Sequence, residues 1–133
     1  MRDVKIPESE KLTINLGHVD LGQIDLLVSE RFYANRSDFI RTAIRNQLQR
    51  HEDIVKGAVD RADIEMGLRR FSRAELEAAV ADGKTLDVQV LGLVVIEPDV
   101  TADLADQAFA RLRYLGALQA PAAVKTILAD RTH

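Results

Sequence analysis

The fold of this chain is decided by a short N-terminal stretch, Lys11-Leu12-Thr13-Ile14-Asn15-Leu16. Apolar and polar residues alternate strictly along it, and this period of two indicates a β-strand with one buried face. The apolar set is Leu12, Ile14 and Leu16, and Gly17 ends the run. The stretch therefore predicts a single short strand whose other face carries only polar side chains.

Two helices are predicted directly after this strand. From Asp20 the apolar spacing becomes helical, and this pattern ends near Arg31. The tetrapeptide Asn35-Arg36-Ser37-Asp38 is typical of a helix start, because Asn is a favourable N-cap and the Asp falls at the third helical position. The helix that follows carries one apolar face, made of Ile40, Ala43, Ile44 and Leu48. Residues 10–50 are thus expected to fold as strand, helix, helix.

A lone strand is not stable in water, because its backbone donors and acceptors stay unpaired. Nothing else within residues 1–50 resembles a partner strand. We therefore expect the strand to pair with its own copy from a second chain around a two-fold axis, which gives an intertwined dimer. The dimer core would contain Leu12, Ile14, Leu16, Ile40 and Ile44. The polar residues Lys11, Thr13 and Asn15 of both chains would then share one solvent-facing ribbon.

The alternating strand, the amphipathic helix and the segment Tyr33-Ala34-Asn35-Arg36-Ser37-Asp38-Phe39-Ile40-Arg41 together resemble the ribbon-helix-helix regulators of the CopG, MetJ and Arc type. The resemblance covers residues 10–50 and implies DNA binding by a dimer. The turn between the helices departs from the pattern, because many relatives have Gly where this chain has Arg31 or Phe32. A left-handed residue there would cost ~1 kcal/mol.

A two-stranded ribbon fits the major groove of DNA, where each base pair presents a distinct pattern of donors and acceptors. Lys11 can donate to guanine, Asn15 can make a paired contact with adenine, and Thr13 can contact a thymine methyl group. The resemblance implies the same base-reading roles. The alternative is an ordinary solvated strand face, since polar alternation is common in sheets.

The start of the second predicted helix suits a DNA phosphate, because it offers free backbone N–H groups and the positive end of the helix dipole. Asn35, Arg36 and Ser37 lie there, and in similar proteins this segment holds the DNA backbone beside the ribbon. Phosphate contacts of this kind fix the register, while the ribbon reads the sequence. A plain N-cap with a surface arginine is the alternative, and both can hold at once.

The second half of the chain has strand and helix patterns of its own. Residues 51–70 have amphipathic helical spacing, and Ser72-Arg73-Ala74-Glu75 is a capping box for a helix that closes at Gly83. Residues 86–96 indicate a strand bent at Gly92. After a turn, Thr101 caps a predicted helix that runs to Gly116 and has Leu104, Ala108, Leu112 and Leu115 on one face.

An internal echo links two of these segments. Leu91-Gly92, Val100 and Leu104-Ala105-Asp106 recur 24 residues later as Leu115-Gly116, Val124 and Leu128-Ala129-Asp130. A strand-plus-helix unit of this length falls in the solenoid range of ~20–29 residues, although chance matches in a Leu- and Ala-rich segment are the alternative. If the echo is real, the strand edge beside Leu93, Val94, Val95 and Ile96 should pair with another chain. The C-terminal half would then drive self-association.

Composition excludes several classes of protein. The 133 residues carry 18 Lys+Arg against 21 Asp+Glu, a formal net charge of −3, which argues against coating DNA by bulk charge. With no Cys and three scattered His, we expect no metal site. No apolar run approaches the ~18–20 residues of a membrane span, and no signal peptide is apparent, so we expect a cytoplasmic protein without membrane contact. No nucleophile motif or phosphate-binding loop is present, so we expect neither an enzyme nor a cofactor.

These observations predict a mainly helical α+β chain in three parts. They are a ribbon-helix-helix DNA-binding domain at 1–52, a helical connector at 53–83 and a strand-helix association module, repeat-like in pattern, at 84–133. The expected function is a sequence-specific transcriptional repressor that binds double-stranded DNA as a homodimer or as a higher oligomer formed through the C-terminal half. The alternative is an antitoxin that neutralises a toxin protein through this half and represses its own operon.

Overall fold

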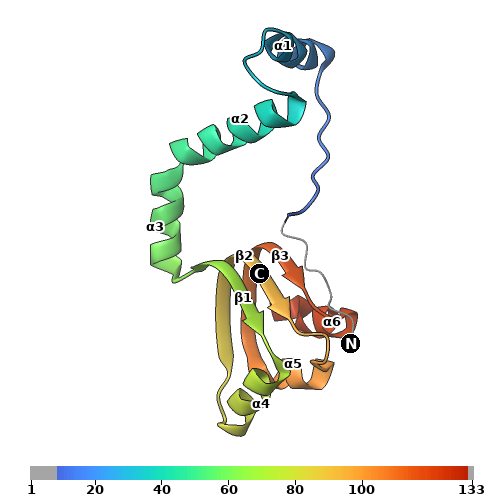
Figure 1. The fold of residues 1–133 in the computed structure, drawn as a ribbon. Helices are drawn as coiled ribbons and strands as arrows, with labels where there is room; N and C mark the ends of the chain where they lie inside the picture. Colours follow the sequence, from blue (N-terminus) through green and yellow to red (C-terminus); the bar gives the residue numbers. More distant parts are fainter. Residues whose placement is uncertain (1–8, 132–133) are drawn as a thin grey trace. The chain divides into compact units, whose positions relative to one another are not determined.

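The computed structural model describes residues 9–131, and its α+β architecture confirms the predicted class (Figure 1). The chain divides into two compact units, which meet in sequence between His51 and Glu52. The first unit contains α1 (His18–Ser29) and α2 (Arg36–Arg50). The second contains α3 (Glu52–Ala62), β1 (Glu65–Phe71), α4 (Arg73–Ala81), β2 (Leu86–Ile96), α5 (Ala102–Ala108), β3 (Phe109–Gln119), α6 (Ala122–Leu128) and the 3-10 turn η1 (Ala129–Arg131). No helix within residues 9–131 is long and apolar enough to cross a membrane.

The turn between α1 and α2 is left-handed at a non-glycine residue. Arg31 has φ +64°. Its N–H donates to the carbonyl of Val28 and that of Phe32 to the carbonyl of Leu27, which is the Schellman arrangement that satisfies the last carbonyls of a helix. Glycine usually occupies this position, so the arginine costs about 1–2 kcal/mol of strain. The departure from the family pattern at this turn thus leaves the helix–turn–helix geometry intact.

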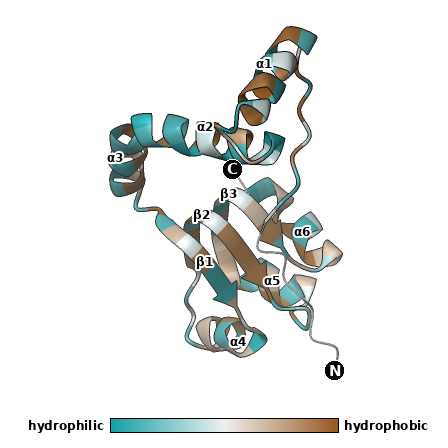
Figure 2. Ribbon diagram, turned by 45° about the horizontal axis from the view of Figure 1, so that its top comes forward, coloured by the Kyte–Doolittle hydropathy of each residue, from teal (hydrophilic) through white to brown (hydrophobic). Residues whose placement is uncertain are grey.

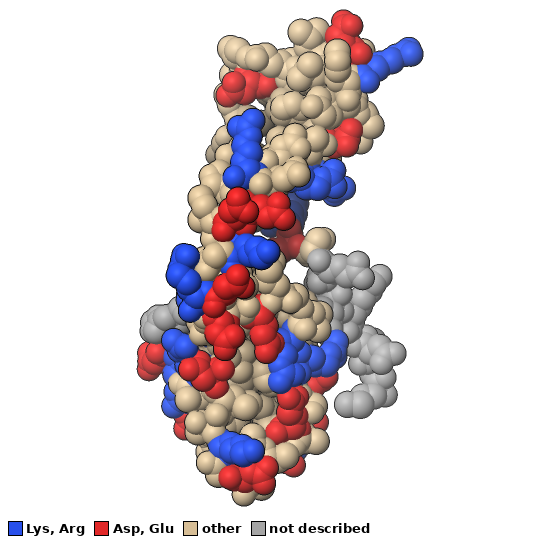
Figure 3. Space-filling view, turned by 90° about the vertical axis from the view of Figure 1, so that its left-hand side faces the viewer, with Lys and Arg blue, Asp and Glu red and all other residues tan. Residues whose placement is uncertain are grey.

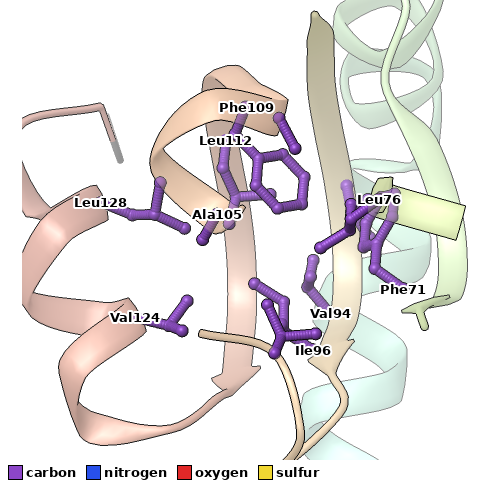
Figure 4. Close-up of a cluster of buried hydrophobic side chains, with 12 residues drawn as sticks. Phe71, Leu76, Val94, Ile96, Ala105, Phe109, Leu112, Val124 and Leu128 are labelled. Atoms are coloured by element: carbon purple, nitrogen blue, oxygen red, sulfur yellow. The ribbon is translucent and has the colours of Figure 1, made fainter. Parts of the chain in front are cut away.

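The second unit is built on a parallel sheet of three strands in the order β1-β2-β3. Helices α4, α5 and α6 each follow one strand and lie on one face of the sheet (Figures 1 and 4). Ser72 and Thr101 cap α4 and α5 through hydrogen bonds from the N–H groups of Glu75 and Leu104, both at 3.2 Å. Both caps were predicted from the sequence and are confirmed.

Two segments predicted as helical are strands instead. The helix expected over residues 51–70 ends at Ala62, and Glu65–Phe71 is β1. The helix expected to run to Gly116 ends at Ala108, and Leu112 and Leu115 lie on β3. In both segments pairing along β2 supplies the hydrogen bonds that a helix would have made locally, and tertiary pairing overrides local spacing. Part of the connector predicted at 53–83 is therefore a sheet strand.

The association edge predicted beside Leu93, Val94, Val95 and Ile96 is not free. These residues lie on β2, the central strand, which pairs with β1 on one side and β3 on the other. Val94, Val95 and Ile96 are almost completely buried. The prediction was wrong because it did not recognise β1, the strand that covers one side of β2. Within residues 9–131, the edge strands of the sheet are β1 and β3.

A single apolar core holds the second unit together. Side chains from the strands and from α4, α5 and α6 point toward one another in it (Figure 4). The rings of Phe71 and Phe109 meet edge to face with centroids 5.1 Å apart, and the Arg69 guanidinium lies 4.4 Å from the Phe71 ring centroid. Figure 2 shows that β2 carries a long hydrophobic stretch. Burial against three short helices thus stabilises a sheet that has only three strands.

Glycines that are register partners on neighbouring strands allow the three strands to lie close together. Gly67 pairs with Gly92, and Gly92 pairs with Gly116. Gly92 and Gly116 have φ +140° and +123°, and a Cβ on either would lie 2.1 Å from the carbonyl oxygen of the glycine on the preceding strand. Only a residue without a side chain fits between these backbones.

We expect Gly92→Ala to destabilise the second unit by about 2–5 kcal/mol, because the new methyl group adds a backbone clash to the strain of a positive φ. Gly83→Ala is the matched control: Gly83 has φ +69° but has no neighbouring atom within 4 Å of its Cβ position. It should cost only about 1–2 kcal/mol. Urea unfolding followed by circular dichroism measures both, and equal losses would contradict the close-approach argument.

Candidate nucleic-acid interface

The predicted base-reading residues lie in a segment without secondary structure. Lys11, Thr13 and Asn15 precede α1, and Figure 1 draws this part of the chain as an extended trace. Every residue from Ser9 to Asp20 is exposed. No strand forms here in the single chain, because the other described elements of this unit are helices that cannot complete a ladder.

The apolar residues that alternate with these polar residues along the chain are also exposed. Leu12, Ile14 and Leu16 are 81%, 60% and 41% exposed. On α2, which Figure 2 shows as mostly hydrophilic, Ile44 and Leu48 are also exposed. Ile24 is the one buried hydrophobic residue among those described in the first unit. The described part of this unit therefore has two helices and an extended segment but lacks a core of its own.

The start of α2 is capped as the sequence predicted. The side-chain oxygen of Asn35 accepts from the N–H of Asp38 at 2.8 Å, and a carboxylate oxygen of Asp38 accepts from the N–H of Ala34 at 2.9 Å. The rings of Tyr33 and Phe39 meet edge to face, with centroids 5.0 Å apart, across the same corner. Asn35 thus uses its side-chain oxygen for the cap.

Two backbone donors remain at this helix end. The N–H groups of Arg36 and Ser37 make no hydrogen bond to any described residue, as expected for the first positions of a helix. Ser37 is exposed beside them. The geometry offers two N–H groups, a hydroxyl and the positive end of a 15-residue helix to an anion.

Arg36 is already paired within the chain. Its Nε and Nη2 donate to the two carboxylate oxygens of Asp25 on α1 at 2.7 and 2.8 Å. The hydrogen bond from Arg36 holds the pKa of the Asp25 carboxyl below its ordinary value, and the same bond raises the pKa of Arg36. Both side chains are about half exposed, so solvent screens the pair. To reach a phosphate, Arg36 must share or leave Asp25.

Sequence reasoning placed Arg36 correctly at the helix start but missed Asp25. The two residues are 11 positions apart and lie on different helices, so no i,i+4 rule connects them. Only the Schellman turn, which reverses the chain between α1 and α2, brings them together. In a capping box the Asp38 carboxylate would accept from the N–H of the N-cap residue, Asn35, whereas in the structure it accepts from the N–H of Ala34, one residue earlier.

Acidic and basic side chains are interspersed on one face of the described residues. On this face, drawn in Figure 3, they alternate without a broad area of one sign. Within residues 9–131 no three His, Asp or Glu side chains gather as metal ligands. This face therefore offers DNA local groups of donors rather than a broad basic surface.

A family model described as the ribbon-helix-helix transcriptional regulator family matches residues 7–125. The chain belongs to this family. The resemblance seen over residues 10–50 is thereby confirmed, and the match continues through the sheet unit into α6. No curated protein and no solved structure matches the chain. Family membership supports a DNA-binding transcriptional regulator, and this family is generally non-enzymatic.

The pair between Asp25 and Arg36 predicts an acid-sensitive contribution to the stability of the ribbon-helix-helix unit. Because the folded pKa of Asp25 is lowered, the pair stabilises the fold above the unfolded carboxyl pKa of about 3.9. That contribution is lost as pH falls through the lowered pKa. Asp25→Asn should make unfolding less dependent on pH in this acid range than in the wild type.

The measurement is urea unfolding at a series of pH values in low salt. Glu30→Gln serves as the control, because Glu30 is exposed and has no ion pair with any residue from 9 to 131. If both variants had the same pH profile, the assigned role of Asp25 would be rejected.

Proposed function

We propose that this protein is a sequence-specific transcriptional repressor that reads the major groove with a ribbon of two strands, one from each chain of a homodimer. The observation that carries the proposal is the uncovered apolar set Leu12, Ile14 and Leu16 in a unit where Ile24 is the one buried hydrophobic residue described. A second copy would pair with the extended segment and cover these side chains. The dimer core would include Ile40 and Ile44 of α2.

The same pairing would organise the base-reading surface. In a strand, alternate residues point to opposite faces, so burial of the apolar set leaves Lys11, Thr13 and Asn15 on the outer face. The paired ribbon would present two copies of each, the residue types that donate to guanine, contact thymine and pair with adenine. Two-fold symmetry in the protein implies a pseudo-palindromic operator.

Phosphate binding would involve the start of α2 in each chain. The N–H groups of Arg36 and Ser37 and the Ser37 hydroxyl are available, while Asn35 positions them by capping the helix. Arg36 would exchange Asp25 for a phosphate, or bind both. Asp25 therefore competes with DNA for the arginine and weakens non-specific binding.

The antitoxin alternative has less support. Antitoxin extensions are commonly disordered until they bind, whereas the second unit has its own buried core. Repression needs only occupancy of a promoter by the dimer, and no cofactor enters this mechanism.

Neighbouring substitutions in the ribbon should have separable effects. We expect Ile14→Glu to break the dimer, because it places a charge in the paired apolar face, and DNA binding should be lost with it. Thr13→Glu is the matched control, one residue away on the polar face; it should keep the dimer and lose DNA binding through repulsion from the DNA. Sedimentation and gel-shift assays measure the two properties. A dimeric Ile14→Glu variant would refute the proposed core.

Base and phosphate contacts should separate in a selection from random duplex DNA. The wild type should select a pseudo-palindromic site, and Asn15→Ala should lose preference at one position of each half-site, at about 1–3 kcal/mol per lost contact. Arg36→Ala should weaken binding to all sequences and lower the salt slope by about 1, whereas Asp25→Asn should raise non-specific affinity. Unchanged selection by a protein with Ala at positions 11, 13 and 15 would exclude ribbon reading.

A further inference from the structure

In the second unit, two of the three glycines at the matching strand positions lie against the carbonyl of a neighbouring glycine, and Gly67 does not. The Gly67 carbonyl lies against Gly92, and the Gly92 carbonyl lies against Gly116. Gly67 has the same kind of backbone, φ +122°, but no described atom lies within 4 Å of its Cβ position. Because Gly67, Gly92 and Gly116 share one register position, we expect the Gly116 carbonyl to point outward from β3 at the opposite edge of the sheet. One edge thus has a vacant glycine site, and the other edge carries the carbonyl that fits it.

We propose that the second unit stacks head to tail, with β1 of one copy pairing in parallel with β3 of another and Gly67 opposite Gly116. This pairing would continue the register already present inside the chain, where β2 pairs in parallel with β1 on one edge and with β3 on the other. The N–H and C=O groups on the outer edges of β1 and β3 would then be paired. The occupant of each edge is therefore a second copy of this chain.

The exposed side chains of the edge strands fit this register. Met66 and Leu68 on β1 are 63% and 58% exposed, and Leu115 on β3 is 46% exposed. Inside the sheet, Met66 lies beside Leu91 and Leu91 beside Leu115, so these residues form one apolar row across the strands. Stacking would place Met66 of the next copy beside Leu115 and its Leu68 beside Ala117. The rows would continue without a polar interruption.

The helical layer also permits this continuation. Helix α4 contacts α5, and α5 contacts α6, so the helices are arranged side by side in the same order as the strands that precede them. The next member would be α4 of the second copy, set beside α6, where Ile127 is exposed. Arg131 bonds to the carbonyl of Phe109 at 3.2 Å, but Phe109 precedes the part of β3 that would pair, residues 114–119.

The alternative is two-fold pairing of identical edges. Two β3 strands related by a two-fold axis would run antiparallel, and Gly67 would keep its vacant side. A head-to-tail contact uses both edges and does not close on itself. In the proposed dimer, each particle would carry two copies of each edge, so repressor dimers would be linked into arrays; this consequence, unlike the contact itself, rests on the proposed function.

Cross-linking of the full-length protein tests the contact directly, because the chain has no Cys of its own. Leu68→Cys and Ala117→Cys are prepared as separate proteins and treated with a short bismaleimide, alone and mixed. The proposal expects a shift from monomer to covalent dimer only in the mixture. Asp82→Cys mixed with Ala117→Cys is the control for random encounters, since Asp82 is exposed and lies outside the strands.

Each outcome decides between the arrangements. Covalent dimer in the mixture alone supports head-to-tail stacking. Covalent dimer from Ala117→Cys or Leu68→Cys alone, above the control, would replace it with two-fold pairing. No product above the control, including for the second pair Met66→Cys and Leu115→Cys, would overturn it. Circular dichroism checks that each variant is folded, and loss of DNA binding by the ribbon variants would leave this result unchanged.

Discussion

Every β-strand needs a neighbour for its backbone N–H and C=O groups, and this requirement governs both units of the chain. In the second unit the neighbours lie within the same chain, and a short helix after each strand covers the shared face. In the first unit the segment around Ile14 has no neighbouring strand among residues 9–131, and its apolar side chains are exposed. Under the proposed function, the first unit would fold together with its partner chain, whereas the second unit has a core of its own.

The sequence predicted the features that depend on local chemistry. Asn35, Ser72 and Thr101 cap their helices at the predicted positions. For the turn between the first two helices, the sequence left the left-handed residue open between Arg31 and Phe32, and in the structure it is Arg31. The predictions that failed concerned segments whose structure depends on residues far away in the sequence. Residues 65–71 have helical spacing but become β1, because β2 lies beside them in space, and that pairing also closed the edge predicted at residues 93–96. The base-reading roles of Lys11, Thr13 and Asn15 remain predictions, because they require a second chain and DNA.

The first unit pairs a cation at the start of α2 with an acid on α1. The formal charge of the chain is slightly negative, and Arg36 is held by Asp25. In the proposed complex with DNA, an arginine that must exchange one anion for another would contribute less to binding at random sites. Discrimination between operator and bulk DNA would then depend more on base contacts.

The left-handed Arg31 also affects the unfolded chain. Glycine at this position would relieve about 1–2 kcal/mol of strain in the native turn. It would also widen the range of unfolded conformations, which opposes folding by about 0.4–1 kcal/mol. These effects have opposite signs, so the arginine is nearer to neutral for stability than its φ of +64° suggests. The strain of Arg31 in the native turn is partly offset in the unfolded state, because an arginine gives the unfolded chain fewer conformations than a glycine would.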